Sequence, residues 1–221
     1  MKTGLLIAAL AFSFVGTAQN TEVFTGEQTK EGVFFEYNMG ARFAGAKSDQ
    51  VTLDAGLHMN GAIGYMFNGI IGIRGVLGLN TFKTVDVIDL GVEDRSYMIG
   101  TTLEGVLSID QLANFGTPGF GLMYHMGFGF SSIVNPSWKE DKLAVAGFNF
   151  EDPAFKGNDD VVNIVFGLTP QYIISDKISI NADFSFVLLM KQDHTLDRFN
   201  NVDVEGTTNY MNSSVGITYK L

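Results

Sequence analysis

Hydrophobic and polar residues alternate with a period of two along most of this chain. Within each alternating segment the large apolar residues share one face, and small polar residues share the other. A period of two predicts β-strands, because successive side chains of a strand point to opposite faces. The eight strands that we predict in this way cover residues 33–43, 51–67, 71–80, 97–109, 120–130, 162–169, 178–188 and 209–221.

The connections between the predicted strands alternate in length. Asn68–Gly69 and the segment 175–177 are typical of tight turns, while 110–119 is somewhat longer. Since the apolar face continues from Phe67 to Ile71, the first turn should contain an odd number of residues or a bulge. The remaining connections are the brief segment 45–50 and the long acidic segments 81–95, 135–160 and 192–206. This pattern predicts antiparallel strands in up-and-down order, and because eight is an even number, both termini of the chain should lie on the same side.

The composition of the two faces distinguishes between kinds of barrel. The apolar face is large and aromatic, whereas the polar face consists mainly of Gly, Asn, Ser and Thr with few charges. A soluble eight-stranded barrel of lipocalin type would instead turn a face dense in Lys and Glu toward water. Small polar residues suit a narrow lumen. We therefore predict an all-β fold, an eight-stranded antiparallel up-and-down transmembrane β-barrel whose apolar face contacts lipid.

The first residues of the chain, MKTGLLIAALAFSFVGTAQN, are typical of a secretory signal. Their apolar run from Leu5 to Val15 is shorter than the roughly 20 residues that a transmembrane helix needs. We therefore predict a signal peptide at 1–18, a short N-terminal segment at 19–32 and the barrel domain at 33–221. The absence of cysteine excludes disulfides and a lipid anchor on Cys. The formal net charge of -10 argues against nucleic acid as a partner.

Two stretches carry a resemblance to a known family, namely the end of the leader, GTAQ, and the last strand, SSVGITYKL. The chain resembles the small eight-stranded outer-membrane barrels, the class that holds the OmpA transmembrane domain and OmpX, and particularly the barrel-domain proteins common in Bacteroidetes. The resemblance implies residence in the cell outer membrane and contact with its lipid and lipopolysaccharide. It also implies a periplasmic location for residues 19–32 and for the short turns, with the long loops outside.

The last strand resembles the signal that the barrel assembly machinery reads in this family. Many family members end in Phe, whereas this chain ends in Leu221 and keeps the alternation. We also expect this strand to pair with the first, because an unpaired strand edge is costly in lipid. The residues assigned to the assembly signal are Val215, Ile217, Tyr219 and Leu221.

Charged residues on the polar face nearly balance in sign. Arg74 and Glu104 should share a depth on neighbouring strands, and Lys220 and Glu36 should meet where the last and first strands pair. Because an isolated charge is expensive in a confined space, we predict a closed lumen crossed by charge pairs. The predicted lumen charges are Glu36, Asp54, Glu104 and Asp183 against Arg42, Arg74 and Lys220.

Histidines and acidic loops are the candidates for other chemistry. His58 and His125 should face the lumen, whereas His194 stands near Asp193 and Asp197 in the sequence QDHTLD. A hydrolase or acyltransferase could use such residues, but a catalytic triad is recognised by geometry, and a solvated loop is the simpler interpretation. The acidic loops could hold Ca²⁺ or Mg²⁺, although no calcium-loop spacing is present. We therefore predict no catalytic residue, no cofactor and no metal site.

These observations favour a non-enzymatic role. We expect a monomer with a side-chain-filled lumen, in a structural or surface-interaction role through its long acidic outer loops, which would contact a surface partner. A narrow channel or carrier for small solutes is the alternative. The lumen distinguishes the two, and an eight-stranded barrel is just wide enough to be filled by its side chains, which favours the first role. An outer-membrane hydrolase or acyltransferase is a distant third.

Overall fold

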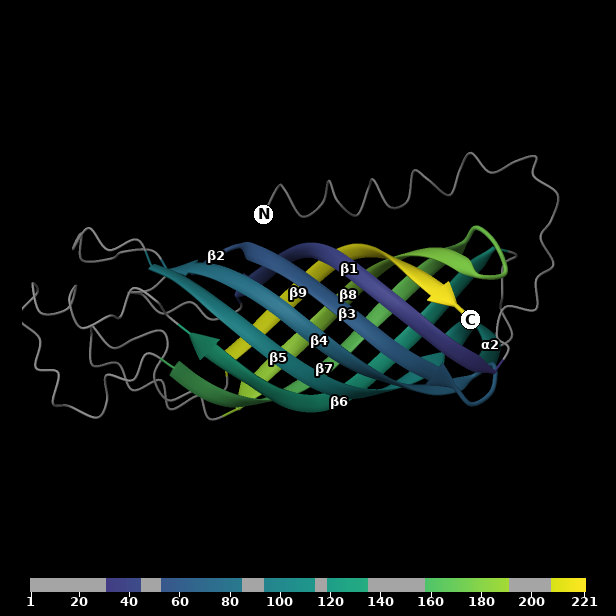
Figure 1. Ribbon diagram of the computed structural model, residues 1–221, viewed down its shortest axis with the longest axis horizontal. Helices are drawn as coiled ribbons and strands as arrows, with labels where there is room; N and C mark the ends of the chain where they lie inside the picture. Colours follow the sequence, from purple (N-terminus) through teal and green to yellow (C-terminus); the bar gives the residue numbers. More distant parts are fainter. Residues whose placement is uncertain (1–30, 45–52, 85–93, 114–118, 135–157, 191–207) are drawn as a thin grey trace, which may run out of the picture.

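The computed structural model describes residues 31–44, 53–84, 94–113, 119–134, 158–190 and 208–221. These residues form a closed antiparallel β-barrel (Figure 1). Its strands are β1 (Gly32–Ala44), β2 (Leu53–Asp54), β3 (Gly56–Met66), β4 (Ile71–Thr84), β5 (Asp94–Ser108), β6 (Phe120–Val134), β7 (Asn158–Ile173), β8 (Ile178–Met190) and β9 (Thr208–Lys220). A short helix, α2 (Ile109–Leu112), follows β5.

Pairing of the first and last long strands closes the barrel. Strand β1 pairs with β3 on one side and with β9 on the other, from Phe34 opposite Lys220 to Ala44 opposite Tyr210. The backbone N–H of Leu221 adds a hydrogen bond of 3.0 Å to the carbonyl of Val33. The predicted all-β closed barrel of eight antiparallel strands is confirmed, since β2 and β3 together make up the predicted second strand.

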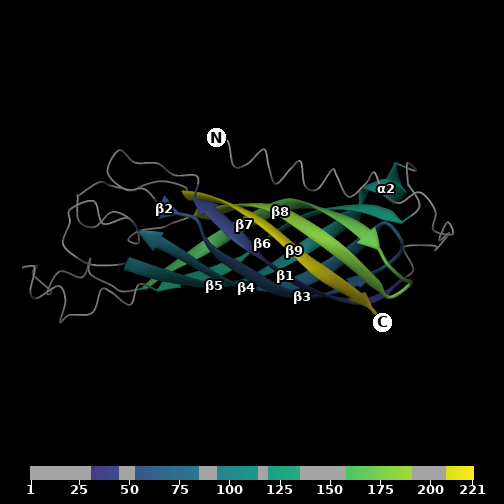
Figure 2. The ribbon, with the colours of Figure 1, turned by 90° about the horizontal axis from the view of Figure 1, so that it is seen from above.

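Most strand boundaries differ from the predicted ones, since β4, β5, β6, β7 and β8 each extend further than predicted at one end or both. The predicted second strand is interrupted at Ala55, between β2 and β3. The predicted fourth strand does not include Ile109, where α2 begins instead. The Asp110 carboxylate accepts hydrogen bonds from the Ser108 hydroxyl and the Leu122 backbone N–H, and these contacts turn the chain. Figure 2 shows α2 beside the barrel, at the same end as the C-terminus. The sixth continues past Thr169 to Ile173.

Side-chain hydrogen bonds fix the two tight turns. Asn68 Oδ1 accepts the backbone N–H groups of Ile70 and Ile71, at 2.8 and 2.7 Å. Because Met66 pairs with Gly72, this connection holds an odd number of residues, as predicted. Ser175 Oγ accepts the N–H of Ile178 at 3.1 Å in the second turn. We call this end of the barrel the turn end and the opposite one the far end.

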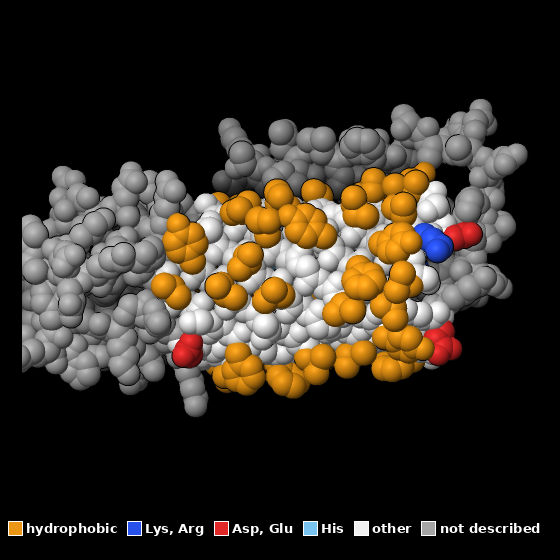
Figure 3. All heavy atoms as spheres, in the orientation of Figure 1, with side chains coloured by type: hydrophobic (Ala, Val, Ile, Leu, Met, Phe, Trp, Pro, Cys, Tyr) orange, Lys and Arg blue, Asp and Glu red, His pale blue; other side chains and the backbone are white. Residues whose placement is uncertain are grey.

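The two faces of the strands have the predicted character. Large apolar side chains point outward, among them Val215 at 66% and Phe130 at 64% relative exposure, while inward side chains are buried and mostly polar. On the wall seen in Figure 3, apolar side chains spread over the strands, and acidic and basic ones lie near the two ends. Among the described residues, no helix is long and apolar enough to cross a membrane.

The structure places the end of the chain as predicted and leaves the leader undescribed. Val215, Ile217, Tyr219 and Leu221 all point outward from the last strand or its end. Strand β1 begins and strand β9 ends at the turn end of the barrel (Figure 1). The predicted signal peptide at 1–18 lies outside the described residues, as does most of the segment at 19–32.

Candidate functional site

The lumen of the barrel is built in three layers. At the turn end, Phe34, Met66 and Val106 form a buried apolar cluster with Met123 packed against it. A second apolar cluster lies at the far end, beside buried polar residues such as Arg42 and His58. Buried charged residues lie between the two clusters, as Glu104 does between Met98 and Val106 on β5. The far-end cluster comprises Met98, Ile133, Val161, Val165, Val187, Leu189 and Tyr210.

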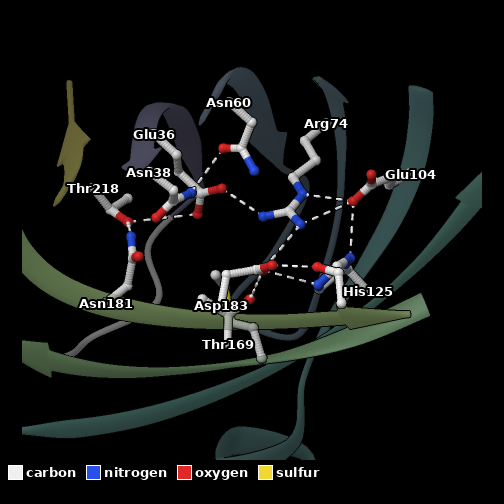
Figure 4. A network of polar contacts seen from close by, with 12 residues as sticks. Glu36, Asn38, Asn60, Arg74, Glu104, His125, Thr169, Asn181, Asp183 and Thr218 are labelled. Atoms are coloured by element: carbon white, nitrogen blue, oxygen red, sulfur yellow. Dashed lines mark hydrogen bonds and ion pairs between the residues drawn. The ribbon is translucent and has the colours of Figure 1, made fainter. Parts of the chain in front are cut away.

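Arg74, from β4, is the centre of the charged layer (Figure 4). Its Nη1 lies 2.5 Å from Glu36 Oε2, and its Nε donates to Glu104 Oε2 at 2.9 Å. Its Nη2 lies 2.9 Å from Glu104 Oε2 and 3.7 Å from Asp183 Oδ2. All four residues are at most 4% exposed. One guanidinium therefore faces carboxylates from β1, β5 and β8, and the predicted pairing of Arg74 with Glu104 is present in the structure.

His125, from β6, bridges two of these carboxylates. Its Nδ1 lies 2.9 Å from Glu104 Oε2 and its Nε2 lies 3.0 Å from Asp183 Oδ2, with the ring 1% exposed. An ionised carboxylate only accepts hydrogen bonds, so both contacts are favourable when both ring nitrogens carry a proton. The ring then acts as a second cation beside Arg74. The sequence placed His125 in the lumen but did not predict these contacts.

Hydroxyl groups complete the coordination of the carboxylates. Thr102 donates to Glu104 Oε1 at 2.6 Å, and Thr169 donates to Asp183 Oδ2 at 2.8 Å. Ser185 donates to the other oxygen of Asp183, and Thr218 lies 3.5 Å from Glu36 Oε1. Satisfied acceptors of this kind reduce the cost of burying charge. We call Glu36, Arg74, Glu104, His125 and Asp183 the charge cluster.

Inward-facing glycines make room for the charge cluster. Gly127 lies opposite Glu104 in the β5–β6 ladder, and Gly167 lies opposite His125 in the β6–β7 ladder. A Cβ atom built on Gly127 would lie 2.7 Å from Cγ of Glu104, and one on Gly167 would lie 2.7 Å from Cε1 of His125. The high glycine content therefore has a packing role in the lumen.

Gly167→Ala should lower the free energy of unfolding by about 1–3 kcal/mol, the usual cost of overpacking a filled interior. The new methyl group would overlap the His125 ring and the carbonyl of Phe184. Urea unfolding of the refolded barrel measures the effect. Gly75→Ala is the matched control, because a Cβ there meets nothing within 4 Å, and equal stability losses in the two variants would contradict the packing role.

The other predicted lumen charges have different partners. Arg42 donates to Asn212 Oδ1 at 2.9 Å and lies 3.0 Å from Met98 Sδ, with its guanidinium carbon 5.0 Å from the centre of the Tyr210 ring. Its contacts are with neutral groups of the far-end cluster, not with a carboxylate among the described side chains. The guanidinium also gains a cation–π interaction with that ring.

Lys220 and Asp54 lie at opposite ends of the barrel. Lys220 stands opposite Phe34 in the β1–β9 ladder, and the charges of Asp110 and Glu36 act on its ammonium group. Glu36 itself gives its carboxylate to Arg74 and Thr218. Asp54 lies in β2 opposite Lys83, and its side chain is outside the described part of the structure.

Of the other histidines and acidic residues considered in the sequence, His58 has structural partners in the lumen, and the rest lie outside the described residues. His58 is buried in the lumen, with Nδ1 2.6 Å from Asn80 Oδ1 and Nε2 3.1 Å from Asn60 Nδ2, so two amides hold its ring. His194, Asp193 and Asp197 lie outside the described residues, as do the acidic loop segments. Within the part of the chain that is described, no group of three or more His, Cys, Asp or Glu side chains could hold a metal ion.

The far-end apolar cluster was not predicted from the sequence. Three of its seven members, Ile133, Val161 and Leu189, lie where the strands extend past their predicted ends. The sequence does indicate this cluster, because it contains runs of consecutive apolar residues such as Val187–Met190. In these runs apolar side chains interrupt the polar inward face. A run of this kind at a strand end indicates that both faces are apolar there.

Solved structures resemble this chain in fold. No family model and no curated protein matches it. The crystal structure of Neisserial surface protein A (NspA) superposes with a TM-score of 0.51 at 12% identity, over 86% of this chain and 97% of that chain. The outer membrane protein OprG from Pseudomonas aeruginosa superposes with a TM-score of 0.49 at 12% identity, over 88% and 98%. The chain therefore has the fold of a small eight-stranded outer-membrane barrel.

Proposed function

We propose that the chain is a monomeric β-barrel of the bacterial outer membrane with a sealed lumen, and that it acts through its long outer loops in a structural or surface-interaction role. The observation that carries this proposal is the layered lumen. The charge cluster fills the middle of the barrel, and an apolar cluster lies at each end of it. The side chains of the charge cluster and of both apolar clusters are buried, so they occupy the lumen in which they lie.

The outer wall supports the membrane location. Apolar side chains are exposed along the strands, including Phe128 at 61% and Ile217 at 56%, a surface that a water-soluble monomer would rarely present. A tilted strand needs about 9–11 residues to cross a bilayer. Strand β3 has 11 residues, and the other long strands have 13 to 16. In this orientation the turn end faces the periplasm and the far end faces outward.

The alternative of a narrow channel is less well supported. Ile133, Leu189 and Tyr210 have no exposed surface at the far end, and Val106 is 2% exposed at the turn end. Ions would have to pass the buried side chains near both ends and an Arg74 guanidinium that is already paired with carboxylates. The hydrolase and acyltransferase alternatives depend on residues outside the described part of the structure, and the buried histidines of the lumen are held by amides or carboxylates.

Purified protein reconstituted in a planar lipid bilayer should produce no stepwise conductance, because buried side chains fill the lumen and would exclude hydrated ions. A porin reconstituted in parallel serves as the positive control. Steps of porin size from the wild-type protein would contradict the sealed lumen and favour the channel alternative. Contact with lipopolysaccharide, recognition by the barrel assembly machinery and a surface partner at the loops are further parts of this proposal.

A further inference from the structure

Three polar atoms around Gly216 are buried in the lumen and have no hydrogen-bond partner among the described residues. They are Asn38 Oδ1 on β1, Asn181 Oδ1 on β8 and Ser214 Oγ on β9, and the three residues are at most 4% exposed. Asn38 and Asn181 both stand opposite Gly216, in the two ladders that β9 forms, and Ser214 lies two residues before it on the same face. Most buried polar atoms in proteins are paired, so three unpaired ones around a glycine point to a bound molecule.

The hydrogen bonds of Asn181 fix the direction of its amide (Figure 4). Asn181 Nδ2 donates to Thr218 Oγ1 at 2.8 Å, and that hydroxyl lies 3.5 Å from Glu36 Oε1. An ionised carboxylate only accepts, so Thr218 gives its proton to Glu36 and accepts from Asn181. The NH₂ group of Asn181 therefore faces Thr218, and its Oδ1 is left as an acceptor.

A second chain of hydrogen bonds fixes the amide of Asn38. His58 Nδ1 donates to Asn80 Oδ1 at 2.6 Å, so Nε2 of the neutral ring accepts from Asn60 Nδ2 at 3.1 Å. Asn60 then turns its Oδ1 toward Asn38, whose Nδ2 donates to it at 3.0 Å. The Oδ1 of Asn38 is left as an acceptor. A Cβ atom built on Gly216 would overlap this oxygen, which therefore lies over the glycine.

We propose that a water molecule is bound in the lumen beside Gly216. It would donate its two protons to Asn38 Oδ1 and Asn181 Oδ1 and accept the hydroxyl proton of Ser214. A buried water typically makes about three hydrogen bonds to groups that otherwise lack partners, which is the number available here. A divalent cation fits less well, because Ca²⁺ and Mg²⁺ take about six or more oxygen ligands.

The water would extend the network of the charge cluster. It would hold the Asn181 amide, which holds the Thr218 hydroxyl toward Glu36, and Glu36 contacts Arg74. Since buried side chains surround the site, exchange of this water with bulk solvent should be slow. The inference depends only on contacts inside the lumen, so it does not depend on the role given to the outer loops in the proposed function.

A crystal structure of the wild-type barrel, at a resolution that shows ordered water, tests the site directly. We expect a density peak within about 2.5–3.0 Å of Asn38 Oδ1, Asn181 Oδ1 and Ser214 Oγ. Absence of a peak there would overturn the proposal. A peak with about six oxygen neighbours at roughly 2.0–2.6 Å would also overturn it, because that coordination belongs to a cation.

Oxygen-17 relaxation dispersion, which counts long-lived buried water molecules, tests the same site in solution. Ser214→Val removes the hydroxyl and places methyl groups toward the water, so the count for the refolded barrel should fall by about one, within the three-partner site described. Ser213→Val is the matched control, because it makes the same change at the next residue of β9, on the outward face, and should leave the count unchanged. Equal counts in Ser214→Val and the wild type, or an equal fall in both variants, would overturn the proposal. The wild-type crystal structure decides it if Ser214→Val does not fold.

Discussion

Replacing Arg74 with alanine should lower the free energy of unfolding by about 3–5 kcal/mol, the usual cost of removing one partner from a buried charge pair. The variant would leave Glu36, Glu104 and Asp183 near one another without the guanidinium, and the His125 ring contacts only the last two. Water cannot offset this cost easily, since apolar clusters lie on both sides of the charge cluster. Urea unfolding, followed by the heat-modifiable shift of the folded barrel on gels, measures the loss.

Lys177→Ala is the control for Arg74→Ala, because it also removes one positive charge, but from an exposed position in a turn. It should change stability by no more than about 0.5 kcal/mol. A loss in Lys177→Ala as large as that in Arg74→Ala would indicate an effect of net charge alone and would contradict the role of the cluster.

The double variant Arg74→Ala with Glu104→Ala should recover part of the loss, with a coupling energy of about 0.5–3 kcal/mol. Arg74 contacts Glu104 through both Nε and Nη2, so removal of both partners eliminates one unpaired carboxylate. Recovery should be incomplete, because Glu36 and Asp183 still lack the guanidinium. A double-mutant cycle without coupling would show that the two side chains do not interact as the structure has them.

Deleting residues 217–221 should abolish formation of the closed barrel. The deletion removes the pairs of the β1–β9 ladder from Phe34 opposite Lys220 to Tyr37 opposite Ile217, and also the hydrogen bond from Leu221 to Val33. The turn-end half of β1 would become an open edge within the apolar band, which is costly in lipid. The expected product is protease-sensitive and shows no heat-modifiable band.

A second variant separates barrel closure from the proposed assembly signal. Changing Val215, Ile217, Tyr219 and Leu221 to serine keeps the backbone ladder and alters only outward-facing side chains. In detergent, without assembly machinery, this variant should refold, whereas the deletion should not. In cells it should accumulate unassembled if these residues are the signal. Heat-modifiable barrels from the deletion would contradict the account of closure, and normal cellular assembly of the serine variant would contradict the signal.

The strands and their facing could be predicted because both follow from a local pattern. Once a segment has a period of two, alternate residues are assigned to opposite faces of the strand. From Val33 to Leu221, the described strands have the predicted side chains on their outward and inward faces. Arg74 and Glu104 could be paired because they lie on neighbouring antiparallel strands, each a few residues from the turn end. The boundary at Ile109 could not, since it depends on the contacts of Asp110 with Ser108 and Leu122.

Contacts across the lumen could not be predicted in the same way. Glu36 and Asp183 lie on strands that do not pair with β4, so their approach to Arg74 depends on strand tilt and stagger around the whole barrel. The bridging position of His125 depends further on the space that Gly167 leaves for its ring. The neutral surroundings of Arg42 follow from Tyr210 and Met98, which lie beyond the polar stretch of the lumen.

The distribution of the charge cluster over the strands has a consequence for the folding pathway. Its members come from β1, β4, β5, β6 and β8, so no single hairpin brings them together. A partly formed sheet would hold Arg74 and its carboxylates without their full set of partners, while the closed barrel satisfies them at once. The unpaired buried charges therefore raise the free energy of the folding intermediates but not that of the closed barrel. This makes the final step of folding cooperative, and equilibrium unfolding should show one transition without a stable open sheet.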